Sequence, residues 1–226
     1  MKKISILLPL ILTLLLIATG CEEEDSDPVN IPDTNFLAAL IEKGVDTNGD
    51  GLISPDEAEL ITSLDVNGAA ISDLTGIESF VSLKYLYCNG NQLSSLDVSN
   101  NTELQCLYCN NNQLTNLDVT SNINLTMLEG ASGPGTSLTL PGLDCSNNQL
   151  TSLDISNNTN LVSFSCSDNL LTNLDISNNT LITDINLSDN PNLAKVCVWV
   201  IPFPPSGVEV DTTNSSNVYF TTDCSK

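Results

Sequence analysis

The 226-residue sequence contains neither histidine nor arginine, and aromatic residues make up only 4% of it. Without histidine, the chain cannot build a histidine-based catalytic triad, a histidine metal site or imidazole acid–base chemistry. Six lysines against 28 acidic residues give a formal net charge of −22. This balance cannot form a basic surface for nucleic acid and would repel phosphate. The sequence therefore predicts no nucleic-acid partner. Because no nucleophile–base constellation is visible in it, we also expect a protein that is not an enzyme.

The stretch from Leu83 to Asn124 repeats itself at a period of 21 residues. Its two lines are LKYLYCNGNQLSSLDVSNNTE and LQCLYCNNNQLTNLDVTSNIN. This period and this spacing of leucine, cysteine and asparagine are typical of a leucine-rich repeat. No single coil can bury its own apolar side, so the coils must stack. Because the repeat is too short for helices on the back face, we expect a mainly β leucine-rich repeat solenoid.

Seven coils are predicted for the repeat region, residues 61–195. They begin at Ile61, Leu83, Leu104, Leu125, Leu140, Leu161 and Ile182. The first coil is degenerate. The coil at 125–139 is short, because a Gly-Pro loop replaces the usual Asn-Gln-Leu. At strand spacing, seven coils form a rod of about 30–35 Å.

Residues one repeat apart should form rows along this rod. Two asparagine rows are expected to satisfy backbone groups of adjacent coils: Asn91, Asn112, Asn148, Asn169 and Asn190, and Asn101, Asn122, Asn158 and Asn179. An inward row of small reduced thiols is expected from Cys88, Cys109, Cys145 and Cys166, since disulfides along it have poor geometry. An outward row, Asp97, Asp118, Asp154 and Asp175, should bond to turn N–H or hydroxyl groups, with a cation ladder as the alternative.

The N-terminal residues 1–20 carry Lys2 and Lys3 and then an apolar run, which is typical of a secretory signal and too short for a comfortable membrane span. Small residues before Cys21 resemble a bacterial lipobox, and this resemblance implies a diacylglycerol and acyl lipid (palmitate-type) on Cys21. Residues 21–32 form an acidic, solvated tether. The acidic cluster also resembles a surface-export signal of Bacteroidetes-type lipoproteins. We expect an exported protein, lipid-anchored in the outer membrane and facing the cell surface, with a periplasm-facing lipoprotein as the alternative.

Residues 33–62 are predicted to form an EF-hand-like N-terminal cap. The ligand positions 1, 3, 5, 7, 9 and 12 of a calcium loop correspond to Asp46, Asn48, Asp50, Leu52, Ser54 and Glu57. Asp33 or Thr34 should cap the entering helix, and Pro55 should start the next one. The competing interpretation is a plain turn followed by a Ser54–Glu57 capping box. We expect a weakly bound structural Ca²⁺ ion that stiffens the cap.

The third and fifth residues of each coil point outward from the front strands by alternation. Coil by coil, these pairs are Tyr85/Tyr87, Cys106/Tyr108, Met127/Glu129, Gly142/Asp144, Ser163/Ser165 and Asp184/Asn186. Tyrosine is enriched at interfaces because it combines apolar area with a polar tip. We therefore predict a ligand-binding patch of Tyr85, Tyr87, Tyr108 and Met127, with Cys106 as an exposed thiol or a partner for another cysteine. Chance exposure is the alternative.

The C-terminal residues 196–226 are predicted to form a β-type cap. Short strands are expected around Val208–Val210 and Val218–Phe220. The open end of the last coil has to be covered, and the candidates for this lid are Trp199, Phe203, Tyr219 and Phe220. Cys197 and Cys224 bracket the cap and are predicted to form a disulfide, because the exported compartment is oxidising.

Taken together, Cys21, the loop Asp46–Glu57 and the NNQLTxLD[VI]S-type units resemble leucine-rich repeat surface lipoproteins of Bacteroidetes-type bacteria, and more distantly internalin repeats. The short coil departs from that pattern. The resemblance implies a monomeric, non-catalytic module that binds a protein or host-surface ligand, or mediates adhesion, and that meets the membrane only through its lipid. A glycan-binding surface lipoprotein of a polysaccharide-uptake system is the alternative.

Overall fold

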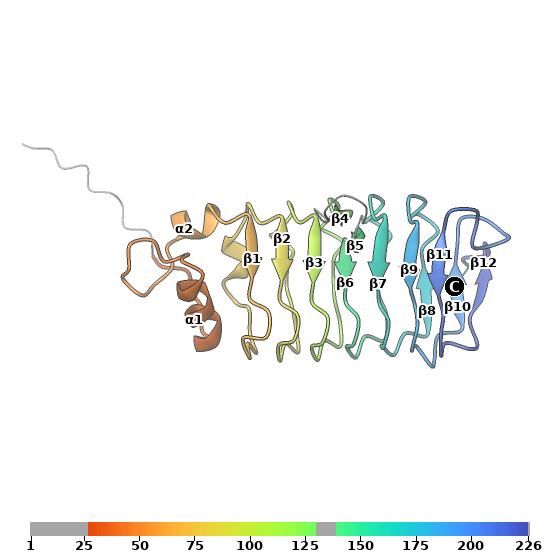
Figure 1. Cartoon of the computed structure of the whole chain (residues 1–226), viewed down its shortest axis with the longest axis horizontal. Helices are drawn as coiled ribbons and strands as arrows, with labels where there is room; N and C mark the ends of the chain where they lie inside the picture. Colours follow the sequence, from red (N-terminus) through yellow and green to blue (C-terminus); the bar gives the residue numbers. More distant parts are fainter. Residues whose placement is uncertain (1–26, 130–138, 226) are drawn as a thin grey trace, which may run out of the picture.

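A computed structural model describes residues 27–129 and 139–225. The predicted signal peptide, the predicted lipidation site Cys21 and the first half of the predicted acidic tether, residues 21–26, lie outside these residues. Two helices, α1 (Thr34–Glu42) and α2 (Pro55–Glu59), precede a long stack of coils (Figure 1). The predicted fold class is confirmed, because the stack is a mainly β, leucine-rich-repeat-type solenoid. Within the described ranges, no helix is long and apolar enough to cross a membrane.

The front of the solenoid is a parallel sheet of seven short strands. In sheet order they are β1 (Ser63–Asp65), β2 (Tyr85–Tyr87), β3 (Cys106–Tyr108), β6 (Leu143–Asp144), β7 (Ser163–Ser165), β9 (Asp184–Asn186) and β11 (Glu209–Asp211). The register is continuous: Leu86 pairs with Leu64 and Leu107. These central leucines are buried, so each strand turns its two flanking side chains away from the core.

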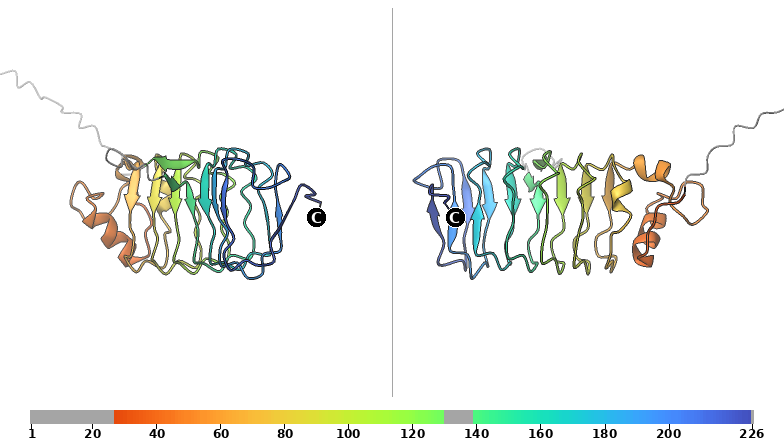
Figure 2. Two further views of the ribbon diagram at one scale, coloured as in Figure 1. Left: turned by 45° about the vertical axis from the view of Figure 1, so that its right-hand side comes forward. Right: turned by 180° about the vertical axis from the view of Figure 1, so that it is seen from behind.

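The opposite side of the solenoid is also extended (Figure 2). Strands β8 (Asn173–Asp175), β10 (Lys195–Cys197) and β12 (Tyr219–Thr221) form a parallel back sheet. Isolated bridges between consecutive residues of the aspartate row continue this pairing from Asp97 to Asp175. The first coil contains a short 3-10 helix, η1 (Ile77–Ser79).

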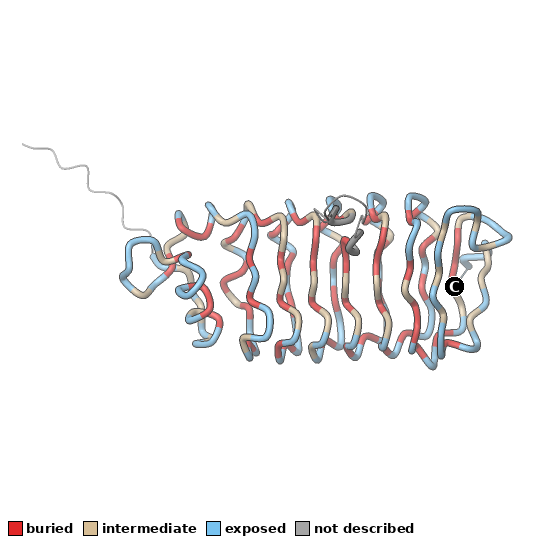
Figure 3. The backbone as a smooth tube through the Cα atoms, in the orientation of Figure 1, coloured by how far each residue is buried: buried red, intermediate tan, exposed pale blue. Residues whose placement is uncertain are grey.

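Buried residues recur along both sides of every coil and form one continuous core (Figure 3). Four free thiols lie fully inside it, one per coil, at Cys88, Cys109, Cys145 and Cys166. Burial raises the pKa of Cys88 to about 12. These side chains therefore act as small apolar residues, as predicted.

Two asparagine rows bind successive coils together, as predicted. In the first row, Asn112 accepts from Leu93 N (3.0 Å) and donates to Cys88 O (3.1 Å). In the second row, Asn122 donates to the carbonyls of Val98 and Asn101 at 2.9 Å each. Each amide thus replaces interactions with water that the coil would lose on stacking.

A third row was not predicted from the sequence. It consists of residues with a positive φ at the same turn of successive coils: Gly68, Gly90, Asn111, Asn147, Asp168 and Asp189. This left-handed conformation favours Gly, Asn and Asp over other residues. It explains why the residue two places after each inward Cys is always one of these three types.

The predicted short coil at 125–139 is wrong. Leu125 is fully buried, and Thr126 N donates to Gln105 O (3.1 Å), so these residues start an ordinary coil. The chain then leaves the front sheet as an antiparallel hairpin of β4 (Met127–Glu129) and β5 (Thr139–Pro141). It returns at Gly142, and β6 pairs directly with β3. The prediction of a coil start at Leu140 fails because Leu125 already fills that interior place.

The C-terminal segment adds further strands to both sheets. Strand β11 pairs with β9, and β12 pairs with β10, both in parallel. Trp199, Phe203 and Phe220 form an aromatic cluster, with ring centroids 5.2 and 4.9 Å apart, that packs on the end of the core. Tyr219 takes no part in this cover, because it is 54% exposed.

Candidate functional site

The front sheet carries three of the predicted contact residues side by side. Tyr85 and Tyr87 project from β2, and Tyr108 projects from β3, all partly buried. The Tyr87 and Tyr108 rings meet edge to face, with centroids 5.4 Å apart and an interplanar angle of 84°. Tyr85 Oη donates to the side-chain oxygen of Gln105 at 3.2 Å. We call Tyr85, Tyr87 and Tyr108 the tyrosine patch.

The fourth predicted contact residue, Met127, does not lie in this row. It belongs to β4, where its backbone pairs with Pro141. Gly142 takes the place that Met127 was expected to fill, because β6 is the strand beside β3. A Cβ at Gly142 would collide with the carbonyl group of Thr126, so only glycine allows the chain to cross there.

Cys106 was expected to be an exposed thiol, and this is wrong. Its side chain is fully buried although it points away from the solenoid core, and it is hydrogen-bonded to Tyr87. Burial raises the pKa of Cys106 to about 12, which keeps the thiol protonated and unreactive at neutral pH. Burial likewise raises the pKa of the Tyr108 hydroxyl.

The predicted calcium loop folds around its own carboxylates. Asp46 accepts from Gly49 N (2.7 Å) through Oδ1 and from Gly51 N (3.0 Å) through Oδ2. Asp50 accepts from Leu52 N at 2.8 Å. The positive φ of Gly49 and Gly51 produces the tight turn that brings these N–H groups round.

Glu57 is held at the far end of this loop. Its Oε1 accepts from Thr47 N and Oγ1, both at 2.7 Å, and its Oε2 accepts from Ser54 N (2.9 Å) in a capping box. The hydrogen bond from Ser54 N, followed by that from the Thr47 hydroxyl, lowers the pKa of Glu57 to about 2. The Ser54–Glu57 capping box, which was the competing interpretation of this segment, is thus present. Glu57 is ionised at neutral pH.

The structure does not gather the carboxylates of this loop around one point. Only one group of three acidic or cysteine side chains in the described part of the chain brings its ligand atoms within 4.8 Å of one another. This group lies elsewhere, at Asp175, Cys197 and Cys224. Binding an ion in the loop would therefore require Glu57 to exchange its bonds to Thr47 and Ser54 for the metal. The donor set itself, all hard oxygens at the proper spacing, fits Ca²⁺.

The cap is joined to the first coil through the segment before α1. Val29 N donates to Ile53 O at 2.8 Å, which ties this segment to the loop. The same segment passes so close to Gly76 that a Cβ there would lie 2.8 Å from Ile31 Cγ1. Loop, segment and coil are therefore one packed unit.

Cys197 and Cys224 are brought together at the other end of the molecule. A disulfide joins them, with Cα atoms 5.5 Å apart. Cys197 occupies the place of the aspartate row in β10, because it pairs with Asp175. The bond fastens the C-terminal tail to the back sheet.

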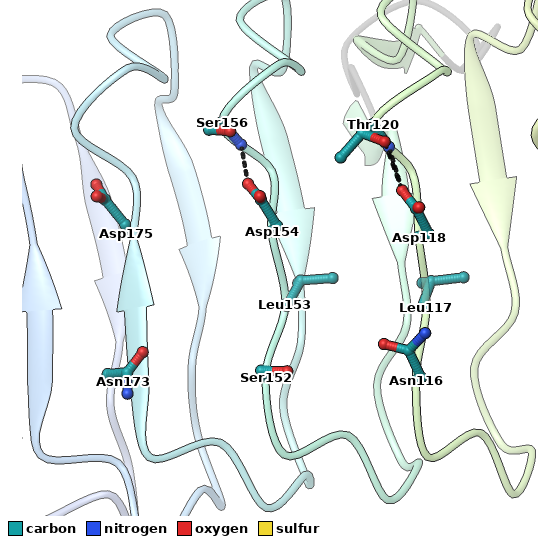
Figure 4. A pocket seen from close by; sticks show the side chains of 10 residues that line it. All are labelled: Asn116, Leu117, Asp118, Thr120, Ser152, Leu153, Asp154, Ser156, Asn173 and Asp175. Carbon is teal, nitrogen blue, oxygen red and sulfur yellow. Dashed lines mark hydrogen bonds between the residues drawn. The ribbon is translucent and has the colours of Figure 1, made fainter. Parts of the chain in front are cut away.

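Three members of the aspartate row, Asp118, Asp154 and Asp175, line an open groove of about 570 Å³ on the back face (Figure 4). Asp118 and Asp154 accept from the backbone N–H two residues ahead, at Thr120 and Ser156 (2.9 Å each). Hydrogen bonds from the Thr120 hydroxyl and N–H lower the pKa of Asp118. The row is thus accounted for by turn hydrogen bonds, as predicted.

The fold and its ladders define a leucine-rich repeat solenoid, and comparisons with known proteins agree. No protein-family model matches the chain. A sequence comparison aligns 71 residues at 37% identity with Internalin J of Listeria monocytogenes serotype 4b (strain F2365), which is 31% of this chain and 8% of that protein.

Solved structures from Listeria monocytogenes are similar over most of the chain. The functional domain of InlJ, described as including a cysteine ladder, has 30% identity and a TM-score of 0.60 over 86% of this chain and 46% of that one. The internalin InlF has 21% sequence identity and a TM-score of 0.55, and the match covers 85% of this chain and 57% of that one. The chain therefore spans about half the length of these solved structures and a small part of Internalin J. It shares the internalin-like repeat fold, including a ladder of cysteines.

Proposed function

We propose that this chain is a non-catalytic surface module that binds a protein partner through the tyrosine patch. One observation carries the proposal: three partly exposed tyrosines stand on adjacent strands of a rigid sheet. Aromatic side chains of this kind supply contact area at a low entropic cost. The internalin-like fold supports a binding role, since repeat solenoids present extended surfaces of this type.

A pull-down from cell-surface extracts tests this proposal. The immobilised mature protein should retain a partner that the double variant Tyr87→Ala/Tyr108→Ala loses. Tyr219→Ala is the matched control, because Tyr219 is exposed on the far edge of the back sheet. Equal retention by all three proteins would refute the patch. Capture of a glycan on an array, lost in the same double variant, would favour the polysaccharide-uptake alternative.

We further propose that the protein is exported and held in the outer membrane by a lipid on Cys21, facing outward. The sequence of residues 1–21 supports this anchor. Cys21→Ser should move the protein from the membrane fraction to the soluble fraction. Digestion by a protease added to intact cells would support outward exposure, and protection until the outer membrane is opened would show that it faces the periplasm.

Calcium is proposed as a structural ion of the loop 46–57. The support is the full set of oxygen ligands at EF-hand spacing, of which Asp46 and Asp50 already lie on a tight turn. Addition of Ca²⁺ to chelated protein should raise its melting temperature. Asp46→Asn/Asp50→Asn removes two charges and leaves one acceptor oxygen at each position for the turn, so it should abolish the response. A wild-type protein indifferent to millimolar Ca²⁺ would exclude this role.

A further inference from the structure

Four consecutive strands of the front sheet carry a symmetrical run of side chains at the same register position. Asp65, Tyr87 and Tyr108 are paired in order across β1, β2 and β3. Asp144 follows directly across β6, since the hairpin β4–β5 stands outside this sheet. Two tyrosines are therefore flanked by one carboxylate on each side. The insertion after Thr126 creates this order, because it brings Asp144 next to Tyr108.

Both flanking carboxylates are held by one oxygen only. Asp65 Oδ1 accepts from Asn67 N at 3.1 Å, and Asp144 Oδ1 accepts from Ser146 N at 3.1 Å and from its hydroxyl. Among the described residues, Oδ2 of each aspartate has no hydrogen-bond partner. The turns thus fix the two side chains in place while one oxygen of each remains to accept from a ligand.

The tyrosines between them suit a cation. Because Tyr87 and Tyr108 meet edge to face, their ring planes differ by 84°, and they present a ring face and a ring edge at one site. An ammonium or guanidinium group over a tyrosine face is attracted by the ring quadrupole. The chain itself has a net charge of −22 and no arginine, so such a cation would come from a partner.

The spacing sets the length of the matching segment. Strands about 4.8 Å apart place the two carboxylates about 14 Å from each other across three intervals. An extended chain advances about 3.4 Å per residue and turns every second side chain to the same side, so residues i and i+4 are also about 14 Å apart. An extended segment lying across the strands would reach both aspartates with residues i and i+4, and the tyrosines with residue i+2.

We propose that the row Asp65–Tyr87–Tyr108–Asp144 recognises an extended cationic segment of a partner protein, with arginine or lysine side chains on the two carboxylates and over the tyrosines. This inference rests on the proposed function, since it specifies the chemistry of the partner of the same face. Charge complementarity selects this occupant, because aromatic faces and oriented carboxylates together favour guanidinium and ammonium groups over neutral or anionic ones.

A capped hexa-arginine peptide is the probe, measured by fluorescence anisotropy in 150 mM NaCl, where long-range attraction to a strongly acidic chain is screened. Asp65→Asn/Asp144→Asn keeps the turn hydrogen bonds and should weaken binding about tenfold or more. The matched control, Asp118→Asn/Asp175→Asn on the back face, removes the same charge and should change the affinity by less than about twofold. Equal weakening by both pairs would show attraction to net charge only and would overturn the inference.

The tyrosines are tested with the same probe. Tyr87→Leu/Tyr108→Leu should weaken binding about tenfold, whereas Tyr87→Phe/Tyr108→Phe, which keeps the rings, should stay within about threefold of wild type. An unaltered affinity of the leucine variant would overturn the inference. The pull-down distinguishes the proposed binding role of the tyrosine patch from the proposed recognition of a cationic segment. If a partner is lost by Tyr87→Ala/Tyr108→Ala but kept by Asp65→Asn/Asp144→Asn, the tyrosine patch binds a partner and the cationic segment is excluded.

Discussion

Asp33 and Ser72 are 39 residues apart in sequence, and their hydrogen bonds fasten the helical cap to the first coil. Asp33 Oδ2 accepts from both Ser72 N and Ser72 Oγ at 2.8 Å. The other oxygen, Oδ1, caps α1 by accepting from Asn35 N (2.8 Å) and Phe36 N (3.0 Å). One carboxylate therefore both starts the helix and binds it to the repeats.

Replacing Asp33 by Ala should loosen this junction. Loss of the helix cap alone costs about 1 kcal/mol of unfolding free energy, and the lost bonds to Ser72 add to it. Urea unfolding and hydrogen exchange of the α1 amides would measure the effect. Asp27→Ala is the control, since Asp27 is exposed ahead of the cap. Unchanged exchange in α1 would contradict the dual role of Asp33.

The same contact predicts a loss of stability in acid. Burial of Asp33 opposes its ionisation, but hydrogen bonds from Ser72, Phe36 and Asn35 outweigh it and lower its pKa to about 2. In the unfolded chain an aspartate titrates near about 3.9. Because the folded pKa is the lower one, the stabilisation is complete above about pH 4 and is lost as the pH falls towards 2.

The check is the difference in unfolding free energy between wild type and Asp33→Asn at several pH values. It should be constant from pH 7 to 5 and shrink below pH 4, because protonated Asp33 resembles the neutral amide. A difference that persists unchanged at pH 2 would rule out Asp33 as the source.

Gly142→Ala should disturb the place where the hairpin leaves the solenoid. The new methyl group would collide with the Thr126 carbonyl, so the crossing segments must move apart. Overpacking of this kind costs about 1–3 kcal/mol. The Leu107 amide, which donates to Gly142 O at 2.8 Å, should exchange faster with solvent. Ser163→Ala, one strand further along the same row, is the control and should leave that amide protected.

Cys224→Ser should release the C-terminal tail from the back sheet. The disulfide links residues 27 apart, and opening a loop of this size costs about 3 kcal/mol. Thermal unfolding with and without reductant would show it: reductant should destabilise wild type to the level of the variant and leave the variant unchanged. If reductant lowered the melting temperature of both proteins equally, a reaction at another cysteine would be responsible.

The repeat period was sufficient to predict the rows, because residues 21 apart must face the same way once the coils stack. It could not locate the hairpin, since Leu125 and Leu140 both match the first position of a coil and only one interior place exists for them. The same insertion moved Met127 out of the front-sheet row in which it was predicted. Cys106 was misjudged because strand alternation predicts which way a side chain points, and not whether neighbouring side chains cover it.

The junction at Asp33 shows a different limit. The sequence offered Asp33 as a helix cap, but its second oxygen binds residues that the chain reaches only after the calcium-type loop and the first strand. Contacts of that range depend on how the cap packs, and no local pattern encodes them. The tyrosine patch, by contrast, was accessible from the sequence, because it depends on the repeat register alone.

The excursion between Thr126 and Gly142 leaves the pairing of β3 with β6 intact, although a whole hairpin departs from the stack at that point. The strands on either side are joined directly, since β6 pairs with β3 and Gly142 O accepts from Leu107 N at the return. This site therefore offers a natural graft point, where a longer loop or a small folded unit can be added beside the front sheet without altering the spacing of the coils.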